Sequence, residues 1–307
     1  MTRPAQRSLR LRAPAKLNWT LEVLGDRPDG YHEVRTVLQT IALSDWVTIS
    51  ATLTPATGLS LTLQGEAGPL AGEPPDANLA YRAAVLLREE AGTRDGACIE
   101  LEKGVPVAAG LGGGSSNAAA VLRGLRRLWD LSLSDDELAS LGARLGANVP
   151  FFLRGGAALA AGRGDAVVPL PDGPPRRLVI AWPARPAATD KTARMYAALH
   201  PEHHTDGART ERVAARLRAG EAVADEDLSN VFAEALAAVD PEAARAFESA
   251  ADLGRPHLAG SGPAFFFLLE PKQAAAPVLD GLDRLGLRAI ETHTLSAAEA
   301  VASEEAL

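Results

Sequence analysis

The chain has 307 residues, 47% of them hydrophobic and 23% charged, and its 39 acidic and 31 basic residues give a net charge of −8. This length fits two domains or one large α/β domain, and the ordinary composition indicates a folded protein. The acidic balance argues against sequence-independent binding of nucleic acid, which needs clustered lysine and arginine against phosphates.

Cysteine content and hydropathy indicate the compartment. Cys98 is the only cysteine, so the sequence offers no intrachain disulfide and no thiolate metal cluster, and both absences favour a reducing cytoplasm. The opening residues lack the apolar core of a signal peptide. No apolar run approaches the roughly 20 residues that a membrane helix needs. We therefore expect a soluble, cytoplasmic protein with no membrane or nucleic-acid partner.

The first third of the chain is expected to be mainly β-structure. Residues 8–12 alternate between polar and apolar types, which is typical of a half-buried strand. Arg27-Pro28-Asp29-Gly30 is strong turn chemistry between two strands. Asn78 can cap a helix that shows helical spacing as far as Glu90. Strands are expected over residues 8–12, 18–24, 34–41, 46–52, 59–63 and 97–102.

Helices and strands alternate without an internal repeat over the rest of the chain, so we predict an α+β fold. Ser134 and Glu137 form a capping box at the start of one helix. The proline-rich stretch 169–175 is the clearest candidate hinge. Helices are expected over residues 115–129, 190–199, 209–219, 226–238, 241–252 and 272–285, with strands over 178–182, 264–269 and 287–294.

The stretch from Gly110 to Ser116 carries four glycines in five positions, followed by two serines and a helix. Glycines let a phosphate chain approach the backbone, and the start of the helix adds unpaired N–H groups and a positive dipole. The serine hydroxyls could hold phosphate oxygens or Mg²⁺. A flexible surface turn that caps a helix is the alternative. A Walker A loop would need lysine where Gly114 stands, and a dinucleotide fingerprint is interrupted by Pro106.

This turn resembles the second motif of the GHMP kinases, Pro-x-x-x-Gly-Leu-Gly-Ser-Ser-Ala. Residues 13–18 and 145–152 are similar to other motifs of the same family, and residues 259–264 resemble its third, glycine-rich motif. The extra glycine and the Asn-Ala-Ala after the serines look like the branch that acts on 4-diphosphocytidyl-2-C-methyl-D-erythritol, as does the turn 29–32. The resemblance assigns ATP binding to Pro106, Val107, Ala108, Ala109, Gly110, Leu111, Gly112, Gly113, Gly114, Ser115, Ser116 and Asn117.

The resemblance implies a two-domain fold with the active site in the cleft between the domains. Residues 1–172 would form the N-terminal, ATP-binding domain and residues 173–307 the C-terminal domain. The implied reaction is ATP-dependent phosphorylation of the 2-hydroxyl of 4-diphosphocytidyl-2-C-methyl-D-erythritol, in the non-mevalonate route to isoprenoid precursors, with Mg²⁺ accompanying ATP. The partner would be this small molecule with its cytidine diphosphate group. Metal ligands and oligomeric state are left open.

Lys16 matches the catalytic cation of the family, and Asn18 would lie on the same face of its strand as an acceptor-binding residue. Without the motif, Lys16 would be read as a solvated lysine at a strand start. The turn works through bare backbone, so we expect Gly112→Val to block ATP while leaving the fold largely intact.

Aromatic residues are expected at the cytidine end of the acceptor. Tyr31 and His32 follow the turn, where a ring can stack on cytosine and a histidine can bond its edge. Thr192 and Tyr196 match acceptor-binding positions of the family, although Tyr196 could instead be an ordinary tyrosine of an amphipathic helix. Asn230 stands where the family has an asparagine on a C-terminal helix.

Asn148 departs from the family, which has an aspartate at this place as the presumed base. An amide cannot act as a general base, but it can orient a hydroxyl by hydrogen bonding. Three interpretations remain: a natural variant that relies on Lys16 and orientation, an engineered substitution, or a catalytically impaired protein that binds the nucleotide or the CDP-alcohol. Some GHMP kinases lack this aspartate. Another GHMP small-molecule kinase is the remaining alternative, and the pair Tyr31-His32 speaks against it.

Overall fold

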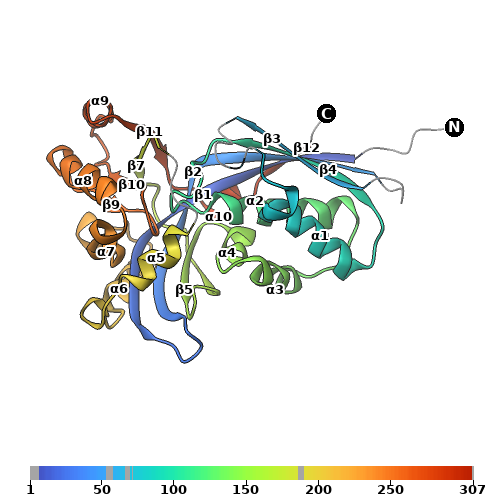
Figure 1. The fold of residues 1–307 in the computed structure, drawn as a ribbon, viewed down its shortest axis with the longest axis horizontal. Helices are drawn as coiled ribbons and strands as arrows, with labels where there is room; N and C mark the ends of the chain where they lie inside the picture. The colour runs from blue at the N-terminus through green and yellow to red at the C-terminus, as the bar shows by residue number, and fades with distance from the viewer. Residues whose placement is uncertain (1–6, 53–57, 66–69, 71, 186–189, 306–307) are drawn as a thin grey trace.

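The computed structural model describes residues 7–52, 58–65, 70, 72–185 and 190–305. It contains an eight-stranded sheet and a four-stranded sheet, each with its own helices (Figure 1). The helices α1 (Leu79–Ala91), α2 (Gly113–Leu128), α3 (Asp135–Leu145) and α4 (Val149–Arg154) pack against the larger sheet in one hydrophobic core. The α+β prediction is confirmed. No helix in the described ranges is long and apolar enough to cross a membrane.

The larger sheet is organised around two long antiparallel strands, β1 (Arg7–Asp26) and β2 (His32–Thr52). Its main strand order is β12-β1-β2-β4-β3, where β3 is Leu59–Gly65, β4 is Gly96–Lys103 and β12 is Ser303–Glu305. β5 (Ala157–Ala161) pairs with β2 and with β6 (Ala166–Leu170), and β8 (Ser229–Asn230) pairs with β1.

Each of the two long strands replaces a pair of shorter strands expected from the sequence. Register shifts between Pro14 and Ala15, Asn18 and Thr20, and Val23 and Gly25 keep β1 in the ladder where the sequence pattern changes. β1 alternates between buried and more open residues at its start and is then buried from Ala13 to Val23. Its later part runs between two cores, which places residues of β1 in the interior of the molecule.

The smaller sheet has the order β11-β7-β10-β9, with β7 at Arg177–Pro183, β9 at His257–Leu258, β10 at Phe265–Leu268 and β11 at Leu287–His293. α8 (Pro241–Ser249) and α9 (Ala276–Arg284) lie beside it, and α7 (Phe232–Val239) lies next to α8 (Figure 1). α5 (Lys191–Ala197) and α6 (Ala208–Arg218) lie next to the long β1–β2 ribbon, and α10 (Ala297–Ala300) precedes β12. The two sheets meet where Trp19 contacts the edge of Phe266, with ring centroids 6.0 Å apart.

Most of the expected elements are present within a few residues of their predicted ends, including the Ser134–Glu137 capping box. The sequence analysis missed the helices α4 and α10 and the strands β5, β6, β8, β9 and β12. It also placed the start of one helix wrongly, because α7 begins at Phe232 and not at residue 226. Residues 169 and 170 belong to β6, so the proline-rich stretch begins as a strand. The domain boundary at residue 172 remains a proposal; β8 and β12, which follow it in the chain, pair with β1.

Candidate active site

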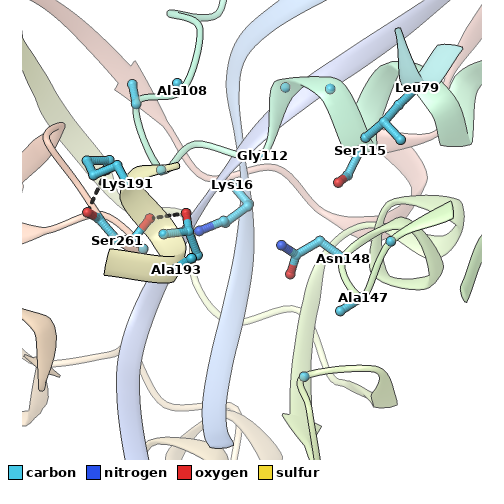
Figure 2. A pocket seen from close by; sticks show the side chains of 18 of the residues that line it. Lys16, Leu79, Ala108, Gly112, Ser115, Ala147, Asn148, Lys191, Ala193 and Ser261 are labelled. Atoms are coloured by element: carbon cyan, nitrogen blue, oxygen red, sulfur yellow. Dashed lines mark hydrogen bonds between the residues drawn. The ribbon is translucent and has the colours of Figure 1, made fainter. Parts of the chain in front are cut away.

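A cavity of about 1090 Å³ brings together residues from β1, β2, α2 and α5 and from the loops that precede α2 and α4. Figure 2 shows Lys16 near the middle of this pocket, with the glycine-rich turn on one side and Asn148 on another. Of the residues predicted to bind substrates, those that line it are Lys16, Asn18, Tyr31, His32, Pro106, Val107, Ala108, Ala109, Gly110, Gly112, Gly113, Gly114, Ser115, Asn117, Asn148, Thr192 and Tyr196.

The glycine-rich turn ends where α2 begins, with Gly112 at the N-cap in a left-handed conformation (φ 75°). No side chain of the described residues caps this end of α2, and the first turn of the helix carries no acidic residue. The first N–H groups of the helix are therefore open to an anion. Gly110 is also left-handed, and an added Cβ would come within 2.2 Å of the Ala259 carbonyl oxygen. Only glycine permits this approach between the turn and the third motif.

Two of the predicted ATP residues lie behind the turn instead of in its surface. Leu111 is fully buried in the core, and its carbonyl oxygen accepts a hydrogen bond from the backbone N–H of Lys16 at 2.9 Å. Ser116 is 2% exposed, and within the described part of the chain neither its Oγ nor the buried Asn117 Oδ1 has a hydrogen-bond partner. Unsatisfied buried polar atoms beside an open turn are consistent with a polar ligand or water completing the site.

The start of the turn is fixed by a buried ion pair that the sequence analysis did not single out. The Lys103 ammonium donates to the Asp45 carboxylate, which also accepts hydrogen bonds from the N–H groups of Gly104 and Val105 at 2.8 Å each. Asp45 is fully buried and Lys103 lines the cavity. A carboxylate with three donors holds the backbone in place where the chain leaves β4. The two residues are 58 positions apart, and no local pattern indicates their contact.

The expectation that Gly112→Val would leave the fold intact is wrong. A Cβ at Gly112 would lie 2.8 Å from the Phe152 ring and 3.1 Å from the Lys16 side chain, and the left-handed conformation disfavours any β-branched residue. Gly114 is the better position for testing the turn. It lines the cavity, and a Cβ there would meet only the Leu79 side chain, at 3.7 Å.

Lys16 is a buried lysine whose amine is held by the side chain of Asn18. It is 5% exposed, and its Nζ donates to the Asn18 Oδ1 at 2.8 Å, while the Asn18 amide donates to the Thr36 hydroxyl at 2.7 Å. Burial, and next the positive charge of Lys191, lower the pKa of Lys16 to about 7. The expected pairing of Lys16 and Asn18 on one strand face is confirmed by this contact, and it fixes the position of the amine.

A second buried lysine, Lys191, lies at the start of α5. It is 4% exposed, and its Nζ donates to the Ser261 carbonyl at 2.6 Å. The neighbouring Thr192 hydroxyl forms a hydrogen bond with the Ser261 hydroxyl at 2.9 Å (Figure 2). Burial lowers the pKa of Lys191 to about 8. The sequence analysis did not assign Lys191 to the site, because its burial depends on the docking of α5 against the third motif.

Asn148 occupies the N-cap position of α4, but its side chain makes no capping hydrogen bond. It is half-buried and lines the cavity. Figure 2 shows its amide pointing toward Lys16 from the opposite side of the pocket. This placement leaves the amide free to form a hydrogen bond with a ligand between the two residues, as expected of an orienting residue.

The other end of the cavity is aromatic. The His32 ring stacks on the Tyr196 ring with centroids 4.8 Å apart, and the Tyr196 and Phe232 rings form a T-shaped pair whose centroids are also 4.8 Å apart. Burial raises the pKa of Tyr196 to about 12, so this tyrosine stays neutral. Tyr31 is 55% exposed, and the Arg163 guanidinium lies 4.9 Å from the centre of its ring. An exposed tyrosine beside a histidine leaves room for a further flat ring at this end.

Asn230 is not on a helix, contrary to the expectation. It lies in β8, where its amide donates to the carbonyls of Leu258 and Gly260 at 2.9 and 2.7 Å, and its Oδ1 accepts from the Phe232 N–H at 3.0 Å. Asn230 thus holds the third glycine-rich motif against the start of α7. That motif in turn forms the wall of the cavity beside Lys16 and Lys191.

The acidic side chains near the cavity do not form a metal cage. Among the described residues, no group of three or more His, Cys, Asp or Glu side chains could hold a metal ion. Asp165 is the one carboxylate among the described lining residues, and it pairs with Arg163 at 3.1 Å. Ser115 lines the cavity next to the turn and offers a neutral oxygen. This donor set suits a cation that arrives already bound to phosphates.

Sequence comparison finds one family and many relatives. Residues 78–156 match the family described as GHMP kinases N terminal domain. A 4-diphosphocytidyl-2-C-methyl-D-erythritol kinase of Geobacillus kaustophilus is 41% identical over 277 residues, which cover 89% of this chain and 92% of that relative. A protein of the same name from Symbiobacterium thermophilum is 41% identical over 287 residues, covering 92% of this chain and 98% of the relative.

Comparison with solved structures finds the same kinase. A crystal structure of 4-(cytidine 5'-diphospho)-2C-methyl-D-erythritol kinase has a TM-score of 0.74 and 35% identity, covering 93% of this chain and 98% of the other. Homoserine kinase from Cytophaga hutchinsonii has a TM-score of 0.72 at 17% identity, which shows a shared fold alone. The expected two-domain GHMP kinase fold is therefore confirmed.

Proposed function

We propose, because the chain belongs to the 4-diphosphocytidyl-2-C-methyl-D-erythritol kinase family, that it transfers the γ-phosphoryl group of ATP to the 2-hydroxyl of 4-diphosphocytidyl-2-C-methyl-D-erythritol. One observation carries the proposal. A single cavity joins an open glycine-rich turn, the buried Lys16 with the Asn148 amide directed toward it, and an aromatic end that suits a cytosine ring. These are the parts needed to hold a donor, a reacting hydroxyl and a cytidine.

ATP lies with its phosphates on the turn, where the backbone N–H groups at the start of α2 face the charge. A Mg²⁺ ion bound to ATP would neutralise part of that charge, and the Ser115 hydroxyl beside the turn could contribute an oxygen to it. A bond forms between the acceptor oxygen and the γ-phosphorus, and the bond to the β–γ bridging oxygen breaks, so ADP leaves with the electron pair. The hydroxyl proton passes to an oxygen of the transferred phosphate. Such a loose transfer depends on positioning and charge more than on a base.

Lys16 and Asn148 flank the reacting hydroxyl in this proposal. The Lys16 amine, held by Asn18 at 2.8 Å, carries positive charge when phosphate is bound, because an anion favours the ammonium form. That charge stabilises the crowded oxygens of the transition state. Asn148 donates or accepts a hydrogen bond and aims the hydroxyl at the γ-phosphorus. Orientation alone can supply a large part of the barrier reduction when the reacting atoms are held in line.

The direct test is coupled ADP release by the full chain with ATP and 4-diphosphocytidyl-2-C-methyl-D-erythritol, with the product identified by phosphorus NMR. We expect acceptor-dependent ADP release and a new phosphate monoester at the 2-position. Binding of both ligands without ADP release would identify a protein that binds but does not turn over. Release that depends on mevalonate or homoserine instead would identify a different GHMP kinase activity.

Gly114→Val is expected to raise the KM for ATP at least 10-fold while leaving the KM for the acceptor unchanged, because the added methyl groups stand where phosphate must approach the turn. Steady-state kinetics with each substrate varied in turn gives both values. Ala219→Val, at the C-cap of α6, is the control on the surface of the protein. The next residue, Gly220, is not used because its left-handed backbone would be strained by valine. An unchanged KM for ATP in a folded Gly114→Val protein would show that phosphate does not approach this part of the turn.

His32→Ala is expected to raise the KM for the acceptor about 5- to 50-fold, the value of one or two lost hydrogen bonds of about 1 kcal/mol each together with the loosened Tyr196 ring. The KM for ATP should stay the same, since the turn lies at the other end of the cavity. The exposed His293 on β11 provides the control, His293→Ala. A weakened KM for ATP with an unchanged KM for the acceptor would place His32 at the nucleotide end.

A further inference from the structure

Lysine is rare in this chain, and its distribution is uneven. The sequence contains four lysines, whereas 27 of the 31 basic residues are arginines. Three of the four, Lys16, Lys103 and Lys191, line the same cavity, and the fourth, Lys272, is exposed. A chain that uses arginine for almost every surface cation therefore keeps lysine in this cavity. Lysine differs from arginine in being a compact point charge whose pKa shifts on burial.

One of the three cavity lysines is paired with an anion, and the other two donate to neutral acceptors. Lys103 forms its ion pair with the buried Asp45. The Lys16 ammonium has the Asn18 Oδ1, a neutral acceptor. Among the described residues, the Lys191 Nζ has the neutral Ser261 carbonyl as its acceptor, although an ammonium has three hydrogens to donate. A buried cation that faces neutral acceptors is costly unless an anion completes its surroundings.

Nearby carboxylates do not supply that anion. Asp240 raises the pKa of Lys191 through its charge, but its carboxylate is held by the Arg185 guanidinium and the Ala243 N–H. Asp165, the acidic residue among the described lining residues, pairs with Arg163. Arg144, which also lines the cavity, pairs with Glu90 at 3.1 Å. Lys191 and Lys16 are thus left as two cations that share one neutral wall.

That wall is the backbone of Gly260 and Ser261. A Cβ added at Gly260 would lie 2.5 Å from the Lys16 Nζ, and the Lys191 Nζ contacts the next carbonyl along the chain. The two amines therefore approach adjacent residues of one backbone segment, Lys16 at Gly260 and Lys191 at Ser261, and they come from different elements, β1 and α5 (Figure 2). Like charges brought together in a buried site repel each other, and an anion of more than one charge relieves that repulsion.

We propose that Lys191 is a second phosphate-binding cation of the reacting centre, which contacts the γ-phosphate of ATP from the side of the third glycine-rich motif, next to Lys16. The inference rests on the proposed function, because the γ-phosphate must pass beside Lys16 on its way to the acceptor. Two lysines then surround the transferred group, while the turn at the start of α2 holds the remaining phosphates. The residue opposite Lys16 is neutral Asn148, so both positive charges are available to phosphate.

Titration calorimetry of the full chain tests the contact through the difference between two nucleotides. Lys191→Met is expected to weaken binding of the non-hydrolysable analogue AMP-PNP, with Mg²⁺, about 10- to 100-fold, the value of one charged hydrogen bond. Binding of ADP should be unchanged, because ADP has no γ-phosphate. Lys272→Met, which removes an exposed lysine, should change neither affinity.

Three results would overturn the inference. Equal weakening of ADP and AMP-PNP would place Lys191 at the inner phosphates, and unchanged affinities would leave it without a phosphate contact. CDP is titrated in the same way, and weaker binding of CDP alone would assign Lys191 to the diphosphate of the acceptor. Removal of a buried cation should not lower thermal stability, but Lys191→Gln, which can still donate to the Ser261 carbonyl, replaces Lys191→Met if the latter does not fold.

Turnover separates this inference from the proposed function. If the unmodified chain releases ADP and Lys191→Met has the same kcat and the same KM for ATP, the inference is wrong and the proposed function stands. If the unmodified chain releases no ADP with the acceptor, the proposed function fails. The comparison of AMP-PNP with ADP still reports the contact of Lys191 in that case, because it measures binding alone.

Discussion

Lys16→Met is expected to lower kcat for phosphoryl transfer about 10²- to 10³-fold, the usual effect of removing one group that stabilises developing charge in a closed site. The KM for each substrate should change little, because the charge acts on the transition state more than on the bound ground state. The reason is the position of the amine, which Asn18 holds at 2.8 Å and which lies between Asn148 and the third motif. Methionine keeps the length of the side chain and removes the charge.

Single-turnover phosphoryl transfer, with the chain in excess over ATP, measures this effect on the chemical step. Lys272→Met is the matched control. Loss of structure would not explain a slow variant, because burial lowers the pKa of Lys16 to about 7 from 10.5. Between these two pH values the Lys16 amine is protonated in the unfolded chain and neutral in the folded chain. Folding therefore has to release a proton, which lowers the free energy of unfolding, and this penalty decreases as the pH rises. Lys16→Met removes this pH-dependent penalty. The thermal stability of the variant should therefore equal or exceed that of the unmodified chain below about pH 10.

An unchanged single-turnover rate in Lys16→Met would contradict the proposed role of Lys16. A parallel loss of ATP affinity and rate would instead indicate that Lys16 binds ground-state phosphate. In that case, the second lysine, Lys191, would become the better candidate for charge stabilisation, because it shares the same wall of the cavity.

Asn148→Asp is expected to raise kcat by up to about 10²- to 10⁴-fold, the usual contribution of a general base, with little change in either KM. Asparagine and aspartate have nearly the same shape, so ground-state binding should be similar while the capacity to accept a proton differs. The side chain at this position points toward Lys16 across the pocket. A carboxylate there would also raise the pKa of Lys16, because an opposite charge nearby favours the ammonium form.

The four-member cycle of Lys16→Met, Asn148→Asp, the double variant and the unmodified chain separates the two roles. We expect non-additive effects on the single-turnover rate, because both residues act on one hydroxyl and one developing charge. A flat rate in Asn148→Asp together with a large loss in Lys16→Met would refute the base role and leave a lysine-centred mechanism. Flat rates in both single variants would mean that the chemistry takes place elsewhere.

The sequence by itself was sufficient to identify the family and to predict the main parts of the candidate site. Local chemistry was sufficient for these parts, because a glycine-rich turn followed by a helix, a capping box at Ser134, and a turn before Tyr31 and His32 each lie within a few residues. The resemblance then placed Lys16, Asn148 and Tyr196, and the structure brings all three to one cavity. The helices α5, α6, α8 and α9 were also found to within a few residues, whereas the start of α7 was wrong and the short α10 was missed.

The tertiary structure alone decided which polar residues are buried and what they contact. Lys191 becomes a cation of the cavity because α5 docks on Ser261, 70 residues later, and Lys103 meets Asp45 across 58 residues. Asn230 lies in β8 and not in the expected helix, and there its amide donates hydrogen bonds to the carbonyls of Leu258 and Gly260. The pKa of a buried lysine and the hydrogen-bond partners of a buried amide both depend on residues that are distant in the sequence. A local pattern of residue types carries no information about these partners, because burial is a property of packing between elements.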